Sequence, residues 1–319
     1  MQIPILSNLF SRTSQRIGWY SICISNNGVY FAYVIHVSGK PPKVMTCSFD
    51  AAEQVTSAML EKLRKNEHID NFQFITLLDS SEYQIQMVDA PNVPVDELKT
   101  AIRWRIKDSL SYHIDDATVD VLQIPSAKTS GDRPQSLFAI SASNETIRKR
   151  VDLFEKAKID LKVIDIPVMA QRNVAELYEE EGRGLALLSF DDSGGILTVT
   201  SGGELYMPRR IEITLGQLQD ADESQRQQYL ERVALELQRS LDYFGRQFHH
   251  IPVKRLLVSA PEQLGLVQLL SANLDVPVEQ LNLSQVLDIS AVPELADSEY
   301  AAHMFLALGA ALRHERRTL

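Results

Sequence analysis

RIGWYSICISNNGVYFAYV, residues 16–34, is the stretch that decides the fold. Aromatic and β-branched residues, which strands favour, flank Asn26, Asn27 and Gly28. An Asn-Gly pair suits a tight turn between antiparallel strands because both residues tolerate positive φ. The stretch therefore predicts a β-hairpin, and it raises the question of whether this turn also holds a phosphate.

Strands and helices alternate after this hairpin. Residues 44–49 predict a third strand, residues 51–65 an amphipathic helix, and residues 72–78 a buried strand. Three strands, a helix and a strand form the start of a ribonuclease H-like layer. This order favours an α/β or mixed α+β protein over a helical bundle or a β-sandwich.

The second half of the chain opens in the same way. Residues 185–192, 195–203 and 204–213 predict three strands joined by turns that contain glycine. A long helix over about 224–248 and an apolar helix over 300–313 follow. Because each half begins with three antiparallel strands, we predict a duplicated architecture.

Composition and charge narrow the class of protein. The 319 residues are 45% apolar and 23% charged, which is ordinary for a globular protein. A net charge of −10 argues against a nucleic-acid partner, since such binding needs Lys and Arg to neutralise phosphates. The first eleven residues lack signal-peptide features, and no stretch nears the roughly 18 apolar residues of a membrane span. We therefore expect a cytoplasmic protein whose membrane contact is indirect.

Four local sequences resemble one family. They are similar to stretches of the PilM-like components of type IV pilus assembly, and most closely to the MshI proteins of the mannose-sensitive haemagglutinin (MSHA) pilus. The resemblance covers nearly the whole chain. The four stretches are AIRWRIKDSLSYHIDDATVDV (101–121), ELYMPRRIEI (204–213), LERVALELQRSLDYF (230–244) and FLALGAALR (305–313).

The resemblance implies the actin-like ATPase fold, in which two ribonuclease H-like domains flank a nucleotide cleft. The first domain would span residues 1–182, with the inserted subdomain of FtsA and PilM at about 81–155. The second would span residues 183–319, with its final helix packing back toward the first. In that fold two hairpins hold the ATP phosphates by backbone amides, an acidic residue on each supports Mg²⁺ or water, and a Gly-Gly turn packs on the adenosine.

The sequence departs from the family pattern at all three nucleotide-binding positions. The first hairpin has no acidic residue between Arg16 and Ser25. In the second hairpin the carboxylates move into the turn, although a one-residue slip would restore Asp191 as the acid. At the adenosine turn, proline and glutamate replace the glycines. We therefore expect the fold without ATP hydrolysis, cofactor or metal, with Mg²⁺ and ATP as the alternative; the degenerate positions are Ser21, Cys23, Ser189, Asp191, Ala260 and Pro261.

The resemblance implies a non-catalytic assembly component of an MSHA-type pilus machine at the inner membrane of a Gram-negative bacterium. It would bind other pilus assembly proteins and dock the cytoplasmic tail of a PilN-like inner-membrane protein, MshJ in MSHA systems. The groove between the inserted subdomain and the first domain would receive this tail, with Arg103, Trp104 and Tyr112 as candidate contacts. Two alternatives are an active PilM-like ATPase and a type II secretion component similar to GspL, which continues into a membrane span that this sequence lacks.

Overall fold

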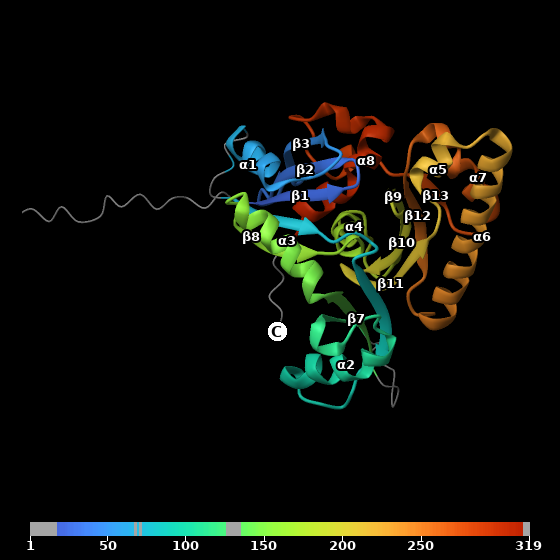
Figure 1. The fold of residues 1–319 in the computed structure, drawn as a ribbon. Helices are drawn as coiled ribbons and strands as arrows, with labels where there is room; N and C mark the ends of the chain where they lie inside the picture. Colours follow the sequence, from blue (N-terminus) through green and yellow to red (C-terminus); the bar gives the residue numbers. More distant parts are fainter. Residues whose placement is uncertain (1–17, 67–68, 70–71, 126–134, 315–319) are drawn as a thin grey trace, which may run out of the picture.

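The computed structural model describes residues 18–66, 69, 72–125 and 135–314. The first eleven residues, expected to carry no signal peptide, lie outside this described part. Two five-stranded sheets, the helices around them and a smaller three-stranded sheet make up the described chain (Figure 1).

The first sheet has the strand order β3-β2-β1-β4-β8. Its first three strands are antiparallel, whereas β4 runs parallel to β1 and β8 runs parallel to β4. The predicted hairpin forms the middle of this sheet. The strands are β1 (Trp19–Ser25), β2 (Gly28–Ile35), β3 (Lys43–Ala51), β4 (Gln73–Leu77) and β8 (Leu161–Asp165).

The second sheet repeats this arrangement, with the order β11-β10-β9-β12-β13. Three antiparallel strands are again followed by two parallel ones. The duplicated architecture predicted from the sequence is therefore confirmed. The strands are β9 (Gly184–Asp191), β10 (Gly194–Ser201), β11 (Glu204–Ile211), β12 (Val253–Ser259) and β13 (Val278–Gln280).

The hairpins that open the two sheets share one register. The last pair before the turn is Ser25 with Gly28 in the first and Asp191 with Gly194 in the second, so each turn has two residues. Both glycines have positive φ, +153° and +145°, and a Cβ on either would meet a backbone carbonyl oxygen within 2.5 Å. Glycine is therefore required at both turns.

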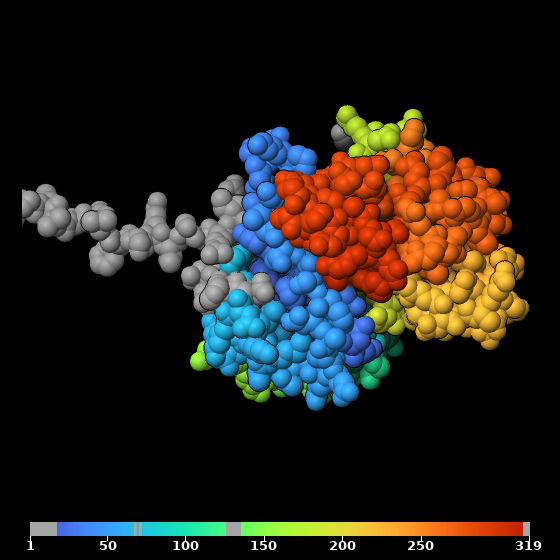
Figure 2. Space-filling model, turned by 90° about the horizontal axis from the view of Figure 1, so that it is seen from above, coloured from blue at the N-terminus to red at the C-terminus, as the bar shows by residue number. Residues whose placement is uncertain are grey.

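Two helices meet between the sheets. Helix α8 (Ser298–Ala311) packs on β1 and β2, and helix α4 (Pro167–Glu176) packs on β9 and β10. They pack tightly at Gly309, where an added Cβ would lie 2.3 Å from the carbonyl oxygen of Ala170. Figure 2 shows the C-terminal elements, in orange and red, lying against the N-terminal strands, in blue. The last helix thus joins the second half of the chain to the first sheet.

A separate sheet is inserted between β4 and β8. It has the order β5-β7-β6, with strands β5 (Tyr83–Asp89), β6 (Ala117–Gln123) and β7 (Ser136–Ser143). Helix α2 (Leu98–Ile106) covers one face of this sheet. The other face packs toward the core of the second sheet.

Helix α3 (Asn144–Lys156) follows the inserted sheet and returns the chain to the first domain. It packs beside α1 (Ser57–Asn66), and its Phe154 is fully buried in the core of the first sheet. The separate sheet therefore ends at Ser143, whereas the insertion expected from the sequence ran to about residue 155.

Three helices cover the outer side of the second sheet (Figure 1). They are α5 (Leu215–Asp220), α6 (Glu223–Gln247) and α7 (Leu266–Asn273). The side chain of Asp222 accepts a hydrogen bond from the backbone N–H of Gln225 and so caps the long helix α6. Short 3-10 helices lie at Val95–Glu97, Lys107–Ser109, Ile114–Asp116, Glu262–Leu264, Leu283–Gln285 and Pro293–Ala296.

Candidate functional site

A cavity of about 290 Å³ lies where the two hairpins face one another. The first hairpin contributes Ser25 and Asn27, and the second contributes Asp191 and Asp192. The end of β4, the start of α5 and the middle of α8 complete its walls. Because the equivalent ends of both five-stranded sheets reach it, the cavity is the cleft between the two halves of the fold.

Two hydrogen bonds cross this cleft in opposite directions. The hydroxyl of Ser193 in the second hairpin donates to Oδ2 of Asp79 at 2.9 Å. The hydroxyl of Ser80 donates to Oδ2 of Asp191 at 3.3 Å. Residues 79 and 80 follow β4, so these bonds join the first half of the fold directly to the second.

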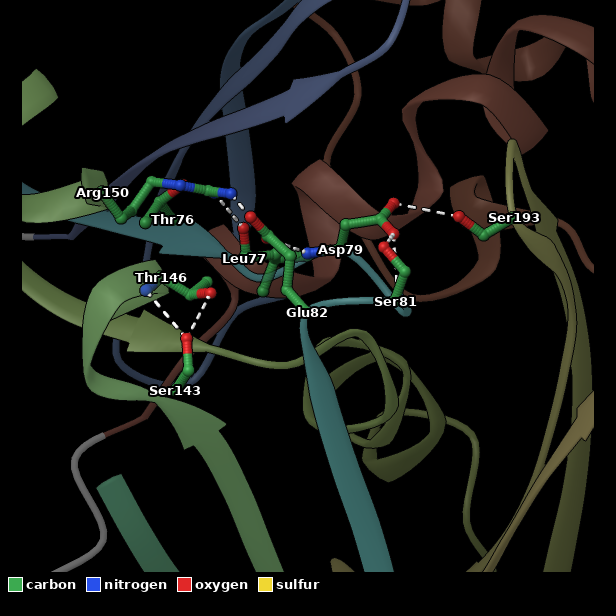
Figure 3. Close-up of polar contacts among 9 residues, drawn as sticks. All are labelled: Thr76, Leu77, Asp79, Ser81, Glu82, Ser143, Thr146, Arg150 and Ser193. Atoms are coloured by element: carbon green, nitrogen blue, oxygen red, sulfur yellow. Dashed lines mark hydrogen bonds and ion pairs between the residues drawn. The ribbon is translucent and has the colours of Figure 1, made fainter. Parts of the chain in front are cut away.

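A buried arginine fixes the segment that carries Asp79 (Figure 3). Arg150, on α3, is only 8% exposed and forms an ion pair with Glu82 at 2.7 Å. It also donates to the carbonyl oxygen of Leu77, and the same Glu82 oxygen accepts the backbone N–H of Asp79 at 2.7 Å. The exit from β4 is therefore held in place before the chain enters the inserted sheet.

The carboxylates in the cleft differ in proton affinity. Burial raises the pKa of Asp191, and the charge of the nearby Asp79 raises it further. Hydrogen bonds from backbone amides of the second hairpin act in the opposite direction but do not outweigh burial. Burial likewise raises the pKa of Asp192. For Asp79, burial acts in the same direction, but hydrogen bonds from Ser81 and Ser193 outweigh it and lower the pKa. Asp79 is the residue of the three whose charge the fold favours.

The cation that acts on these acids, Arg210, lies outside the cleft lining, and its charge favours the ionised forms of Asp79 and Asp191. Among the described residues that line it, none is Lys or Arg, and His303 is the one basic side chain. No three His, Cys, Asp or Glu side chains in the described part of the chain are arranged to hold a metal ion. The walls therefore carry negative charge and apolar surface.

Two of the degenerate nucleotide positions, Cys23 and Asp191, line the cleft. Burial raises the pKa of the Cys23 thiol to about 12, which keeps it protonated and unreactive. Ser21 is not among the lining residues, and its hydroxyl donates to the carbonyl oxygen of Ala307 on α8 at 2.7 Å.

Ser189 belongs to a buried polar network behind the second hairpin. Its hydroxyl donates to the side-chain oxygen of Gln171 on α4 at 2.5 Å. The amide nitrogen of Gln171 donates in turn to the carbonyl oxygens of Leu187 and Ile196 and to the hydroxyl of Thr198. This network ties α4 to β9 and β10 and does not line the cleft.

Ala260 and Pro261 are both buried and do not line the cleft either. The carbonyl oxygen of Ala260 accepts a hydrogen bond from Gln280 at 2.7 Å, and the backbone N–H of Glu262 donates to Ser298 at 3.2 Å. The turn at which the family places its adenosine glycines is thus attached to β13 and to the start of α8.

The three candidate partner contacts lie on the inserted subdomain but differ in availability. Arg103 donates two hydrogen bonds to the carbonyl oxygen of Ile114 and so supports the segment after α2. Tyr112 is half-buried, whereas the side chain of Trp104 is 59% exposed. Trp104 alone of the three offers a large free apolar surface.

The sequence analysis did not identify Asp79 as a cleft residue. A signal was present, because Asp79 comes directly after the buried strand β4, and the carboxyl ends of parallel strands face the binding crevice in α/β sheets. Gln171 gave no such signal, since its partners lie on strands that follow it by 16 to 27 residues.

No helix in the described part of the chain combines the length and the apolar character needed to cross a bilayer.

Residues 42–187 match the family model of the type IV pilus assembly protein PilM. A solved structure titled "PilM-PilN type IV pilus biogenesis complex" is similar to 93% of this chain and 98% of that chain, with a TM-score of 0.72 and 18% identity. A search of curated protein sequences finds no significant match.

Two further solved structures are similar with lower scores. One is the cytoplasmic domain of EpsL, an inner-membrane component of the type II secretion system of Vibrio cholerae, with a TM-score of 0.48, 13% identity, and coverage of 76% of this chain and 82% of that one. The other is a Bacteroides thetaiotaomicron protein with an actin-like ATPase fold and unknown function. Its TM-score is 0.46 and its identity is 10%, and the match covers 88% of this chain and 96% of that one.

The expectation of fold is confirmed by the duplicated sheets and by the likeness to PilM. The chain has the actin-like ATPase fold with a separate inserted sheet, and residues 42–187 are similar to the PilM family model.

Proposed function

We propose that this PilM-like chain is a non-catalytic assembly component of a type IV pilus machine of the MSHA kind. It acts in the cytoplasm at the inner membrane of a Gram-negative bacterium, where it docks the cytoplasmic tail of a PilN-like protein, MshJ in MSHA systems. The observation that carries the proposal is the likeness to PilM of the PilM–PilN complex, which extends over 93% of this chain.

The inserted subdomain supports the docking role. The family match over residues 42–187 includes the whole inserted sheet and its helix α2. On α2, Trp104 exposes 59% of its surface, although aromatic side chains are usually buried. Exposed aromatic anchors are the side chains that most often dominate binding at protein interfaces.

The cleft supports a non-catalytic role. Mg²⁺ and ATP would need a carboxylate on the first hairpin, and Ser25 and Asn27 stand there instead. Asp79 and Asp191 are engaged with serines of the opposite half of the fold. Asp79, Asp191 and Asp192 would also repel a polyphosphate, and no lysine or arginine lines the described cleft to offset this repulsion.

Docking is tested with a synthetic peptide of the PilN-like tail, labelled with a fluorophore and titrated with the purified chain. We expect saturable binding, with and without ATP. Trp104→Ala is expected to weaken binding at least about tenfold, the loss typical of an interface hot spot. Tyr243→Ala is the matched control, because this aromatic residue on α6 is 42% exposed and lies on the second domain.

Failure of the peptide to bind under both conditions would overturn the docking proposal. Equal loss in both variants would instead show that Trp104 is not the anchor.

The non-catalytic proposal is tested by calorimetric titration with Mg·ATP up to millimolar concentration. We expect no heat of binding and no release of phosphate. A saturable signal would favour the alternative, a PilM-like protein that still binds or hydrolyses ATP.

A further inference from the structure

A second cavity, of about 530 Å³, separates the inserted sheet from the second five-stranded sheet. One wall is formed by Tyr83, Gln84, Ile85 and Gln86 at the start of β5. The opposite wall includes Pro208, Arg209 and Arg210 on β11. The cavity therefore lies between two strands that belong to different sheets.

Each of these strands presents its edge to the cavity. Successive side chains of a strand point to opposite faces of its sheet, so a cavity beside one face would be lined by every second residue. Here consecutive residues line both walls, and both β5 and β11 are the outermost strands of their sheets. Within the described chain, neither strand forms a backbone hydrogen bond to a further element on its outer side.

An unpaired strand edge is a template for another strand, because every second residue directs its N–H and C=O outward. On β11 the outward pattern is interrupted by Pro208, which has no N–H to donate. Strand β5 contains no proline. The edge of β5 is therefore the better template.

Positive charge lines the β11 side of the cavity. Arg209 and Arg210 are both exposed, and in the described part of the chain neither forms a salt bridge with a carboxylate. The guanidinium of Arg209 lies 5.6 Å from the centre of the Tyr243 ring, and Arg210 donates to the carbonyl oxygen of Ser193. These contacts orient the two cations, in a chain whose net charge is −10. The charge of Arg210 also acts on Asp79 and Asp191 in the neighbouring cleft, but neither carboxylate forms a salt bridge with it in the described chain.

We propose that this cavity receives an extended segment of a partner protein that carries carboxylate side chains and adds to the inserted sheet as a strand beside β5. Main-chain hydrogen bonds to β5 hold the segment, and its carboxylates meet Arg209 and Arg210. The bound segment would link the inserted sheet to the second domain, since the two walls come from these two parts of the fold.

This surface is separate from the one proposed around Trp104. Helix α2 covers one face of the inserted sheet, whereas Tyr83, Ile85 and Met87 of β5 pack toward the core of the second domain. The inference therefore does not depend on the docking of a PilN-like tail.

The test uses a display library of ten-residue peptides selected against the purified full chain. We expect the recovered peptides to be rich in β-branched residues and to carry Asp or Glu. Binding is expected to fall at least tenfold in the double variant Arg209→Glu/Arg210→Glu. The control variant is Arg148→Glu/Arg232→Glu, which makes the same change of charge at exposed arginines of α3 and α6.

Amide exchange of the unmodified chain, followed by NMR, supplies a readout that needs no variant. A strand added to β5 would protect alternate amides among residues 83–86, because the others already pair with β7. Selection of no peptide, equal binding to both double variants, or unchanged exchange along β5 would each overturn the proposal. If the Trp104 site binds its tail peptide while these results are negative, the proposed function stands and this inference fails.

Discussion

The hairpins β1–β2 and β9–β10 share a register, a two-residue turn and a positive-φ glycine after the turn, yet their polar chemistry differs. Counting back from the turn, Ser25 is equivalent to Asp191, and Cys23 is equivalent to Ser189. The first hairpin thus meets the cleft with neutral groups and the second meets it with carboxylates. Backbone geometry is shared between the halves because the fold requires it, whereas the side chains at the cleft are free to differ.

The helix behind each hairpin shows the same contrast. Ser21 of the first hairpin makes a single short hydrogen bond to a backbone carbonyl of α8. Behind the second hairpin, Gln171 of α4 connects to four partners on β9 and β10. The second hairpin is therefore fastened to its helix by a side-chain network, and the first mainly by apolar packing.

The largest expected effect comes from breaking the contact between α4 and α8, which holds the two halves together. In Gly309→Ala the new Cβ would meet the backbone carbonyl oxygen of Ala170 at 2.3 Å, so a helix must shift. We expect a loss of about 3 kcal/mol in the free energy of unfolding, the upper part of the usual range for overpacking. Equilibrium unfolding in urea measures this loss of stability.

Gly245→Ala is the matched control, because this glycine lies on the exposed side of α6 with no atom within 4 Å of an added Cβ. There alanine should stabilise the helix by about 0.5–1 kcal/mol. Equal effects of both substitutions would contradict a tight contact at Gly309.

The next effect distinguishes the two hairpins. Gln171→Leu leaves the hydroxyls of Ser189 and Thr198 without their buried partner and should cost about 2 kcal/mol. Ser21→Ala removes one hydrogen bond from the first hairpin and should cost about 1 kcal/mol. Chemical denaturation of both variants gives the comparison, and a larger loss in Ser21→Ala would reverse our ranking of the two networks.

A double-mutant cycle of Asp79→Ala and Ser193→Ala tests the link across the cleft. We expect a coupling energy of about 1 kcal/mol, since the bond joins a half-buried carboxylate to a hydroxyl. The pKa of Asp79 is lowered from its ordinary 3.8 by hydrogen bonds that outweigh the effect of burial. The coupling should therefore be present above pH 3.8 and disappear as the pH falls through the lower folded value. Additive single effects at neutral pH would exclude the link.

The smallest expected effect concerns Asp191, the acid that the second hairpin has and the first lacks. Burial raises its folded pKa above the ordinary 3.8, so its charge opposes folding at neutral pH. Asp191→Asn removes this charge, while its Oδ1 can still accept the N–H of Ser193 and its Nδ2 can donate to the hydroxyl of Ser80. It should raise the thermal midpoint by roughly 2 °C at pH 7.5. The gain should shrink as the pH falls through the folded pKa, because the wild-type carboxyl then becomes neutral. Thermal scans at several pH values would refute this if the gain stayed constant.

Much of the fold could be predicted from local patterns. The Asn-Gly turn and its flanking strands gave the first hairpin, and the glycine turns after residue 185 gave its counterpart. The end of the inserted sheet was harder to predict, because a helix such as α3 has the same periodicity whether its Phe154 packs in the insertion or in the first domain.

The candidate site was only partly predictable. Positions carried over from the family pattern included Cys23 and Asp191, which do line the cleft, but also Ser21 and Ser189, whose hydroxyls are used in helix contacts. Residues two apart on a strand point to the same face, so the members of each pair differ only in their position along the strand. The residue nearer the turn reaches the cleft, and the residue further back packs on α8 or α4, which no local pattern indicates.

By itself, the sequence determined the acidic composition and the local conformations, namely the two hairpins and their turn glycines. These conformations depend on residues close together in the chain. Tertiary structure alone decided that Asp79 and Ser193, 114 residues apart, would join across one cleft. It also decided that the edges of β5 and β11 would face a common cavity lined by two arginines. Such encounters depend on how the sheets and helices pack, and no local pattern records that packing.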